Sequence, residues 1–174
     1  MEQSSRNQKI FTMSLLVIYL LVLTWIILFK MTFTFQQLPD FRNINLIPFA
    51  GSAIVNDLID FEEIIDNILI FVPFGIYMSI LKPNSTFLKR IAPIASVSLL
   101  FEVFQFIFAI GATDITDFIG NTFGGIIGIG IHFILYKILK TETKTNKTLN
   151  ILASIGTACF IALFTLLIMA QSQN

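Results

Sequence analysis

The stretch DITDFIGNTFGG, residues 114–125, decides the fold because it places two aspartates, an asparagine and three glycines at the start of a long apolar run. That run continues to Leu139, and about 20 mostly apolar residues are enough to cross a bilayer as a helix. Four further runs have this character, at about residues 10–29, 64–81, 88–110 and 149–170.

The composition indicates a membrane protein. Of the 174 residues, 55% are hydrophobic and 13% are charged, and the mean hydropathy is +0.82. Soluble domains carry about twice this share of charged residues. We therefore predict an all-α fold, in which residues 1–174 form a single integral membrane domain, a bundle of five transmembrane helices. The run over 10–29 is too long and uniform for a signal peptide, so we expect it to remain as a membrane span.

The basic residues gather on one side of the predicted bundle. Nine of the eleven lysines and arginines lie before the first run, between the second and third, or around the junction of the fourth and fifth; the other side has Lys30 and Arg42. Cytoplasmic loops of membrane proteins hold the excess of lysine and arginine. We therefore expect a cytoplasmic N-terminus and an extracytoplasmic C-terminus.

Small and polar residues share one face of the predicted helix over 115–139. At about 100° per residue, four of its five glycines fall on the same stripe as Asp114, Asp117 and Asn121, and bulky side chains fall on the other side. Small residues four apart allow two membrane helices to approach closely. We predict close packing against the second or third helix through Gly120, Gly124, Gly125 and Gly128. Pro73 and Gly75 interrupt the second run and are further packing positions.

Other polar residues inside the predicted spans are candidates for a shared site. Glu102 and Gln105 lie three apart and share a helix face, and Asn67 lies near the start of the second span. An ionisable group inside a span usually faces a partner or a water-filled cavity. The candidate outward-facing ligand site comprises Asn67, Glu102, Gln105, Asp114, Asp117 and Asn121. The structural alternative is that these groups hydrogen-bond to one another and join three helices.

Several chemistries have no support in the sequence. His132 lies about 22 Å along the helix from Asp117, too far to share a metal ion with the acids. Cys159 is the only cysteine, and we expect it to pack in the core. We expect no metal, no cofactor and no nucleic-acid partner. The expected partner is the lipid bilayer.

Four motifs in this order resemble the VanZ-like family: NLIPF (45–49), NILIFVPFG (67–75), EVFQ (102–105) and DITDFIGNTFGG (114–125). The resemblance covers about residues 42–136, and the fifth helix at about 149–170 lies beyond it. It implies that Asn45 belongs to the ligand-binding set, beside the acids and amides above. Many family members carry an aspartate where Thr116 stands here.

The family's namesake is an accessory factor in glycopeptide resistance, chiefly to teicoplanin. The resemblance therefore favours a non-enzymatic, multi-pass protein of the bacterial cell membrane that lowers sensitivity to teicoplanin-type or other cell-envelope antibiotics. Its candidate ligands are a lipid-linked envelope precursor and a lipophilic glycopeptide. Two alternatives stay open. One is a membrane enzyme acting on such a precursor, with Glu102 and Asp117 as catalytic acid and base; the other is a small lipid or ion transporter.

Overall fold

Five helices make up most of the described chain. The computed structural model describes residues 2–29, 41–49, 54–55, 58–59 and 61–171. Its helices are α1 (Glu2–Phe29), α2 (Phe61–Leu81), α3 (Phe87–Phe108), α4 (Ile115–Leu139) and α5 (Glu142–Gln171). All five are long and apolar enough to cross a membrane. The prediction of an all-α bundle of five membrane-length helices is therefore confirmed, and the protein is a multi-pass membrane protein.

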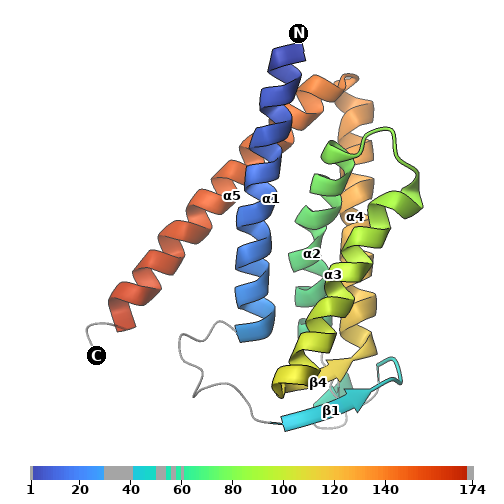
Figure 1. Ribbon diagram of the computed structural model, residues 1–174, viewed down its shortest axis with the longest axis vertical. Coiled ribbons are helices and arrows are strands. Elements are labelled where there is room, and N and C mark those ends of the chain that lie inside the picture. Colours follow the sequence, from blue (N-terminus) through green and yellow to red (C-terminus); the bar gives the residue numbers. More distant parts are fainter. Residues whose placement is uncertain (1, 30–40, 50–53, 56–57, 60, 172–174) are drawn as a thin grey trace.

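The helices do not form a regular five-membered ring. As Figure 1 shows, α1 to α4 lie roughly alongside one another, whereas α5 starts beside the end of α4 and slants past α1. The core of buried apolar side chains is formed mainly by α1, α2 and α3, and it includes Leu23, Phe71 and Ile94. The hydroxyl of Tyr19 donates a 2.7 Å hydrogen bond to the carbonyl of Ile70 and so joins α1 to α2.

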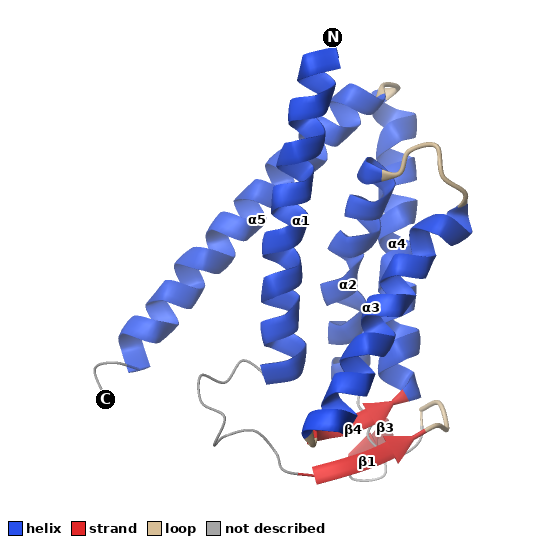
Figure 2. Ribbon diagram, viewed as in Figure 1, coloured by secondary structure: helices blue, strands red, loops and turns tan. Residues whose placement is uncertain are grey.

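Short strands close the end of the bundle away from the N-terminus (Figure 2), and they were not predicted. Strand β1 (Phe41–Asn45) runs parallel to β4 (Ile110–Asp114), with Asn45 opposite Asp114. The other two, β2 (Ile54–Val55) and β3 (Leu58–Ile59), form a small antiparallel pair. The β4 strand also connects α3 directly to α4. Pairing with β1 therefore fixes the point where α4 enters the membrane region.

Helices α2 and α4 pack backbone against backbone. A Cβ atom added to Gly124 would overlap the carbonyl oxygen of Ile68, and one added to Gly128 would overlap that of Val72. A Cβ atom added to Gly75 of α2 would overlap the carbonyl oxygen of Gly125 on α4. Each of these three positions therefore accommodates only a hydrogen atom between the two helices.

The other predicted packing positions are less restricted. A Cβ atom on Gly120 would lie 3.5 Å from the Cβ of Asn67, which is ordinary contact. Gly125 also faces α3, where a Cβ atom would crowd the side chain of Ile94. Pro73 lies inside α2, which is helical from Phe61 to Leu81. The stripe of glycines on α4 thus serves mainly the contact with α2.

Helix α5 begins earlier than the predicted 149–170. The polar segment 141–148, which lies before the predicted span, is helical from Glu142. The connection from α4 is short because Lys140 adopts a left-handed conformation with φ 59° and ends that helix. Polar residues are compatible with a helix that extends beyond the membrane. The expectation for Cys159 was also wrong, since α5 exposes this side chain.

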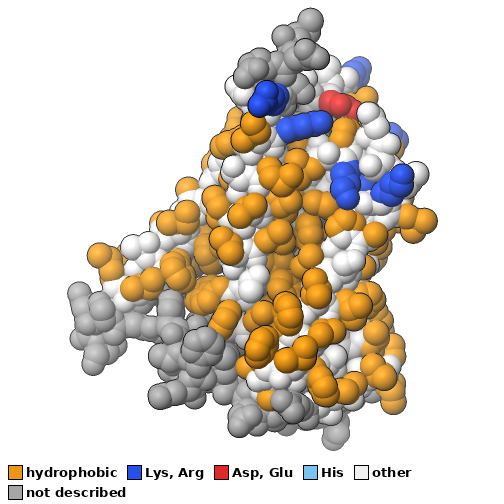
Figure 3. Space-filling view, in the orientation of Figure 1, with side chains coloured by type: hydrophobic (Ala, Val, Ile, Leu, Met, Phe, Trp, Pro, Cys, Tyr) orange, Lys and Arg blue, Asp and Glu red, His pale blue; other side chains and the backbone are white. Residues whose placement is uncertain are grey.

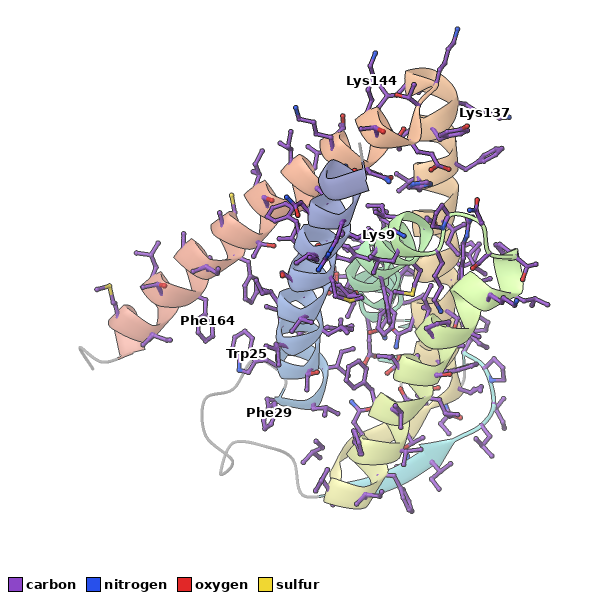
Figure 4. All side chains as sticks on the ribbon, turned by 45° about the horizontal axis from the view of Figure 1, so that its top comes forward. Lys9, Trp25, Phe29, Lys137, Lys144 and Phe164 are labelled. Atoms are coloured by element: carbon purple, nitrogen blue, oxygen red, sulfur yellow. The ribbon has the colours of Figure 1, made fainter. Side chains whose placement is uncertain are left out.

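A buried polar pair joins α5 to α1. The Nδ2 of Asn150 donates to the Oγ1 of Thr12 over 2.8 Å, and both side chains are buried. Nearer the other end of α1, the ring of Trp25 meets that of Phe164 edge-on, with centroids 4.9 Å apart (Figure 4). These two contacts hold the upper and lower parts of α5 to the same helix.

We expect Thr12→Val and Asn150→Leu to be coupled in a double-mutant cycle. Hydrogen bonds between membrane helices contribute about 0.6 kcal/mol on average and about 1.7 at most, so the coupling should fall in this range. Unfolding of the purified protein by dodecyl sulfate measures it. The control is Thr157→Val, because the Thr157 hydroxyl bonds to the Ala153 carbonyl within α5. If Thr12→Val combined with Thr157→Val showed equal coupling, the Thr12–Asn150 contact would not be the cause.

Lysine and arginine side chains gather at the end of the bundle that carries the N-terminus (Figure 3). The C-terminal end of α5 lies toward the opposite end. Lys30 lies outside the described residues. For Arg42 the structure describes the backbone, which belongs to β1, but not the side chain. The cytoplasmic location of the N-terminus stays a prediction.

Candidate functional site

Asp114 joins three segments where β4 becomes α4. Its Oδ1 accepts a 2.7 Å hydrogen bond from the backbone N–H of Thr116 and so caps α4. Its Oδ2 accepts a 3.1 Å bond from the Nδ2 of Asn45, which lies 69 residues earlier in the chain. The side chain is 1% exposed. A carboxylate satisfies the free N–H groups of a helix start and is favoured by the helix dipole, so Asp114 stabilises the fold here.

Glu102 attaches α3 to the same junction. Its Oε2 accepts a 2.8 Å hydrogen bond from the backbone N–H of Asp114, and its side chain is 4% exposed. Its backbone carbonyl accepts a 3.0 Å bond from the hydroxyl of Thr113. The carboxylates of Asp117 and Asp114 both act electrostatically on Glu102. Three acidic groups therefore lie in one region, and two of them are engaged in holding β4.

The NLIPF segment is anchored to the start of α4. The backbone N–H of Phe49 donates a 3.0 Å hydrogen bond to the Oγ1 of Thr116. The Oδ1 of Asn45 accepts a 3.2 Å bond from the N–H of Ile47 and shapes the turn. Leu46 and Ile47 are 71% and 68% exposed. This turn therefore presents large apolar side chains at the end of the bundle, beside the acidic junction.

Asn67 and Asp117 form the accessible part of the predicted site. The Nδ2 of Asn67 on α2 donates a 2.6 Å hydrogen bond to the Oδ1 of Asp117 in the first turn of α4. Both side chains are half-buried. The pair lies where the close contact between α2 and α4 begins, since a Cβ atom at Gly120 would meet Asn67. A carboxylate and an amide are thus held side by side and remain partly accessible.

Gln105 and Asn121 are buried and turn to different partners. The Nε2 of Gln105 donates a 3.3 Å hydrogen bond to the carbonyl of Ile27 on α1. The Nδ2 of Asn121 donates a 3.0 Å bond to the Oγ of Ser98 on α3. Within the described part of the chain, the Oε1 of Gln105 and the Oδ1 of Asn121 accept no hydrogen bond. These amides lie between helices, away from the surface.

The predicted set is therefore divided into three groups. Asn45, Glu102 and Asp114 form a buried clip around β4; Asn67 and Asp117 form a half-buried pair; and Gln105 and Asn121 contact α1 and α3 separately. The roles of Thr113, Thr116 and Ser98 were missed. A signal for the capping role of Asp114 was present, because an aspartate directly before an apolar periodic run is typical of a helix start.

The described residues show no metal-binding constellation. No three His, Cys, Asp or Glu side chains among them are arranged to share an ion. The Nε2 of His132 lies 3.3 Å from the Oδ1 of Asn146, which joins α4 to the start of α5. This contact is at the end of the bundle opposite to Asp117. His132 is thus part of a helix contact and lies apart from the acidic region.

The comparison with protein families covers the helices that build this site. The VanZ/LLP1 family model matches residues 16–140. The chain belongs to the VanZ family. Protein VanZ of Enterococcus faecium is 41% identical over 126 residues, which are 71% of this chain and 74% of that protein. The family that the four motifs indicated is therefore confirmed, and no solved structure matches the chain. The VanZ-family match extends from α1 to the end of α4 and includes every residue of the predicted set.

Proposed function

We propose that this VanZ-family protein is an accessory factor of the bacterial cell membrane that lowers sensitivity to teicoplanin-type glycopeptides or other cell-envelope antibiotics. Membership of the family supports this role. The observation that carries the proposal is the half-buried Asn67–Asp117 pair, which lies near the exposed NLIPF turn at one end of the bundle. The opposite end carries the basic side chains (Figure 3).

The chemistry of this region suits an amphiphilic ligand. Asp117 offers a carboxylate and Asn67 an amide, so together they can accept and donate hydrogen bonds to a polar head group. Leu46 and Ile47 present apolar surface close to α4. A lipid-linked envelope precursor and a lipophilic glycopeptide both combine a polar head with an apolar chain. We assign ligand contact to Asp117 and Asn67.

We assign Glu102 to holding β4 rather than to acid–base chemistry. Its carboxylate accepts a hydrogen bond from the backbone of Asp114 and is almost fully buried. A catalytic acid must come within hydrogen-bond reach of its substrate.

The orientation that we expect from the basic residues, with the N-terminus cytoplasmic, would put Asp117 at the outer surface, where it would meet an envelope precursor.

Replacement of Asp117 by asparagine is expected to reduce protection. Hydrogen bonds to a charged group contribute about 1.5–3 kcal/mol, so loss of the charge should weaken ligand binding about tenfold or more. The measurement is the minimal inhibitory concentration of teicoplanin in cells that express each variant at equal membrane abundance. It should fall toward the value of cells without the protein.

The matched control is Asp66→Asn. Asp66 lies next to Asn67 on α2, carries the same charge at the same end, and is exposed. Asp66→Asn should keep full protection. Equal protection by Asp117→Asn and the wild type would remove the pair from the proposed site. If wild-type expression gave no protection at all, the proposed function would be wrong for this member.

A further inference from the structure

A groove opens between α1 and α3 at the basic end of the bundle, and α2 forms its floor. Its volume is about 500 Å³, and its lining includes Lys9 and Met13 from α1, Met78 from α2, Lys82 directly after α2 and Pro93 from α3. An adjoining hollow of about 490 Å³ shares Lys82 and Pro93 and reaches Lys89. Figure 1 shows α1 and α3 on either side of α2 at this end. The two hollows adjoin at Lys82 and Pro93, and together we call them the basic groove.

Toward the other end of the bundle, α1 and α3 are joined directly. There the Nε2 of Gln105 reaches the carbonyl of Ile27. At the basic end, the α2–α3 connection is held instead by Arg90, whose Nε donates to the carbonyl of Lys82 over 3.1 Å and whose Nη2 donates to that of Pro83. Arg90 thus keeps this connection folded over α3 and away from α1.

The groove combines cations at its mouth with apolar side chains below them. Lys9, Lys82 and Lys89 are all exposed. Among the described residues, neither hollow is lined by an aspartate or a glutamate. The apolar part includes Met13 and Met78, from the first and second helices. A ligand that fits must therefore be negatively charged at one end and hydrocarbon at the other.

The basic side chains elsewhere at this end have different surroundings. Lys144 and Lys147 line neither hollow. Lys137 lies over the ring of Phe133, 4.6 Å from its centroid. Figure 4 shows Lys9 turned from α1 toward α2, whereas Lys137 and Lys144 project outward. An excess of lysine at a cytoplasmic end explains the number of cations, but it does not explain their position around an apolar groove.

We propose that the basic groove binds an anionic phospholipid from the leaflet that faces this end. Its phosphate lies between Lys9 and Lys82, with Lys89 beside it, and one acyl chain follows Met13 and Met78. Basic pockets between transmembrane helices attract anionic lipid head groups in this way. The bilayer supplies the ligand directly, and the apolar floor excludes a free anion as the full occupant. This site is separate from the Asn67–Asp117 pair, which lies at the opposite end.

Native mass spectrometry of the purified full-length protein tests the proposal. The probes are phosphatidylglycerol and phosphatidylcholine with identical acyl chains. The wild type should retain phosphatidylglycerol in preference to phosphatidylcholine. The variant with Lys9→Gln and Lys82→Gln should lose most of this preference, roughly fivefold for each lysine removed. Both side chains are exposed, so the variant should fold, and circular dichroism checks this.

Two further variants and a competition experiment distinguish lipid binding in the groove from attraction to surface charge and from binding of phosphate alone. The variant with Lys144→Gln and Lys147→Gln removes the same charge from the same end and should keep the preference. Met13→Trp leaves every lysine in place but fills the groove, and it should reduce binding of phosphatidylglycerol. Equal losses in both lysine variants, or no lipid preference in the wild type, would overturn the proposal. So would full displacement of phosphatidylglycerol by millimolar inorganic phosphate, or unchanged binding by Met13→Trp.

Discussion

Gly124→Ala is expected to destabilise the protein although it adds a single methyl group. The new Cβ atom would overlap the carbonyl oxygen of Ile68, which belongs to the backbone of α2 and cannot turn aside. The two helices must therefore separate, and Gly128→Ala should act in the same way at Val72. Overpacking a close-packed interior costs about 1–3 kcal/mol, and a clash with backbone belongs at the upper end of this range.

The control for Gly124→Ala lies on the same helix. A Cβ atom added to Gly130 meets nothing within 4 Å. Alanine is a better helix former than glycine by about 0.8–1.0 kcal/mol, so Gly130→Ala should leave the stability unchanged or raise it. Unfolding by dodecyl sulfate, followed by circular dichroism, gives the free-energy difference for each variant. Similar stabilities for Gly124→Ala and Gly130→Ala would show that α2 and α4 are not packed backbone to backbone.

Glu102→Leu is expected to loosen the junction between α3 and α4. The substitution leaves the backbone N–H of Asp114 buried without its acceptor, and a buried polar group without a partner costs about 1–3 kcal/mol. Hydrogen exchange at β4 should therefore become faster, and the free energy of unfolding should fall. Because Asp114 also caps α4 and binds Asn45, the start of α4 and strand β1 should loosen together.

Glu102→Gln separates the effect of the hydrogen bond to Asp114 from that of the ionisable carboxyl group, because glutamine keeps an acceptor oxygen but cannot ionise. The glutamine Oε1 can still accept from the N–H of Asp114, whereas the side chain can no longer ionise beside Asp114 and Asp117. We expect near-normal stability and, if Glu102 has only the structural role assigned above, unchanged protection against teicoplanin. A loss of protection with normal stability would instead return the Glu102 carboxylate to the functional site. A loss of stability equal to that of Glu102→Leu would contradict the assigned hydrogen bond.

The helices could be predicted from the sequence, but the strands could not. Each apolar run is a local property of about 20 residues, and its transfer into lipid depends little on the rest of the chain. The pairing of β1 with β4 joins five-residue segments that are far apart in the sequence. Neither segment carries a periodic signal long enough to reveal it. The early start of α5 was missed for a related reason, because residues 142–148 have almost no apolar periodicity and their contacts, such as that of Asn146 with His132 on α4, are tertiary.

The sequence predicted which residues belong to the candidate site, but not how they are arranged or which partners they bind. The sequence places Asp114, Asp117 and Asn121 on one helical stripe, and the structure places all three at or just after the start of α4. Their partners differ, since Asp114 binds Asn45, Asp117 binds Asn67 and Asn121 binds Ser98. A helical stripe specifies the direction of a side chain but not which neighbouring element lies there.

By itself, the sequence determined which segments form helices, which family the chain belongs to and which end carries the basic residues. These properties follow from local apolar content, from short motifs and from charge between the spans. Only the tertiary structure decided which acidic residues are engaged in the fold and which remain accessible. The physical reason is that the partners of Asp114 and Glu102 are backbone amides and a distant asparagine, brought together only when β1 pairs with β4.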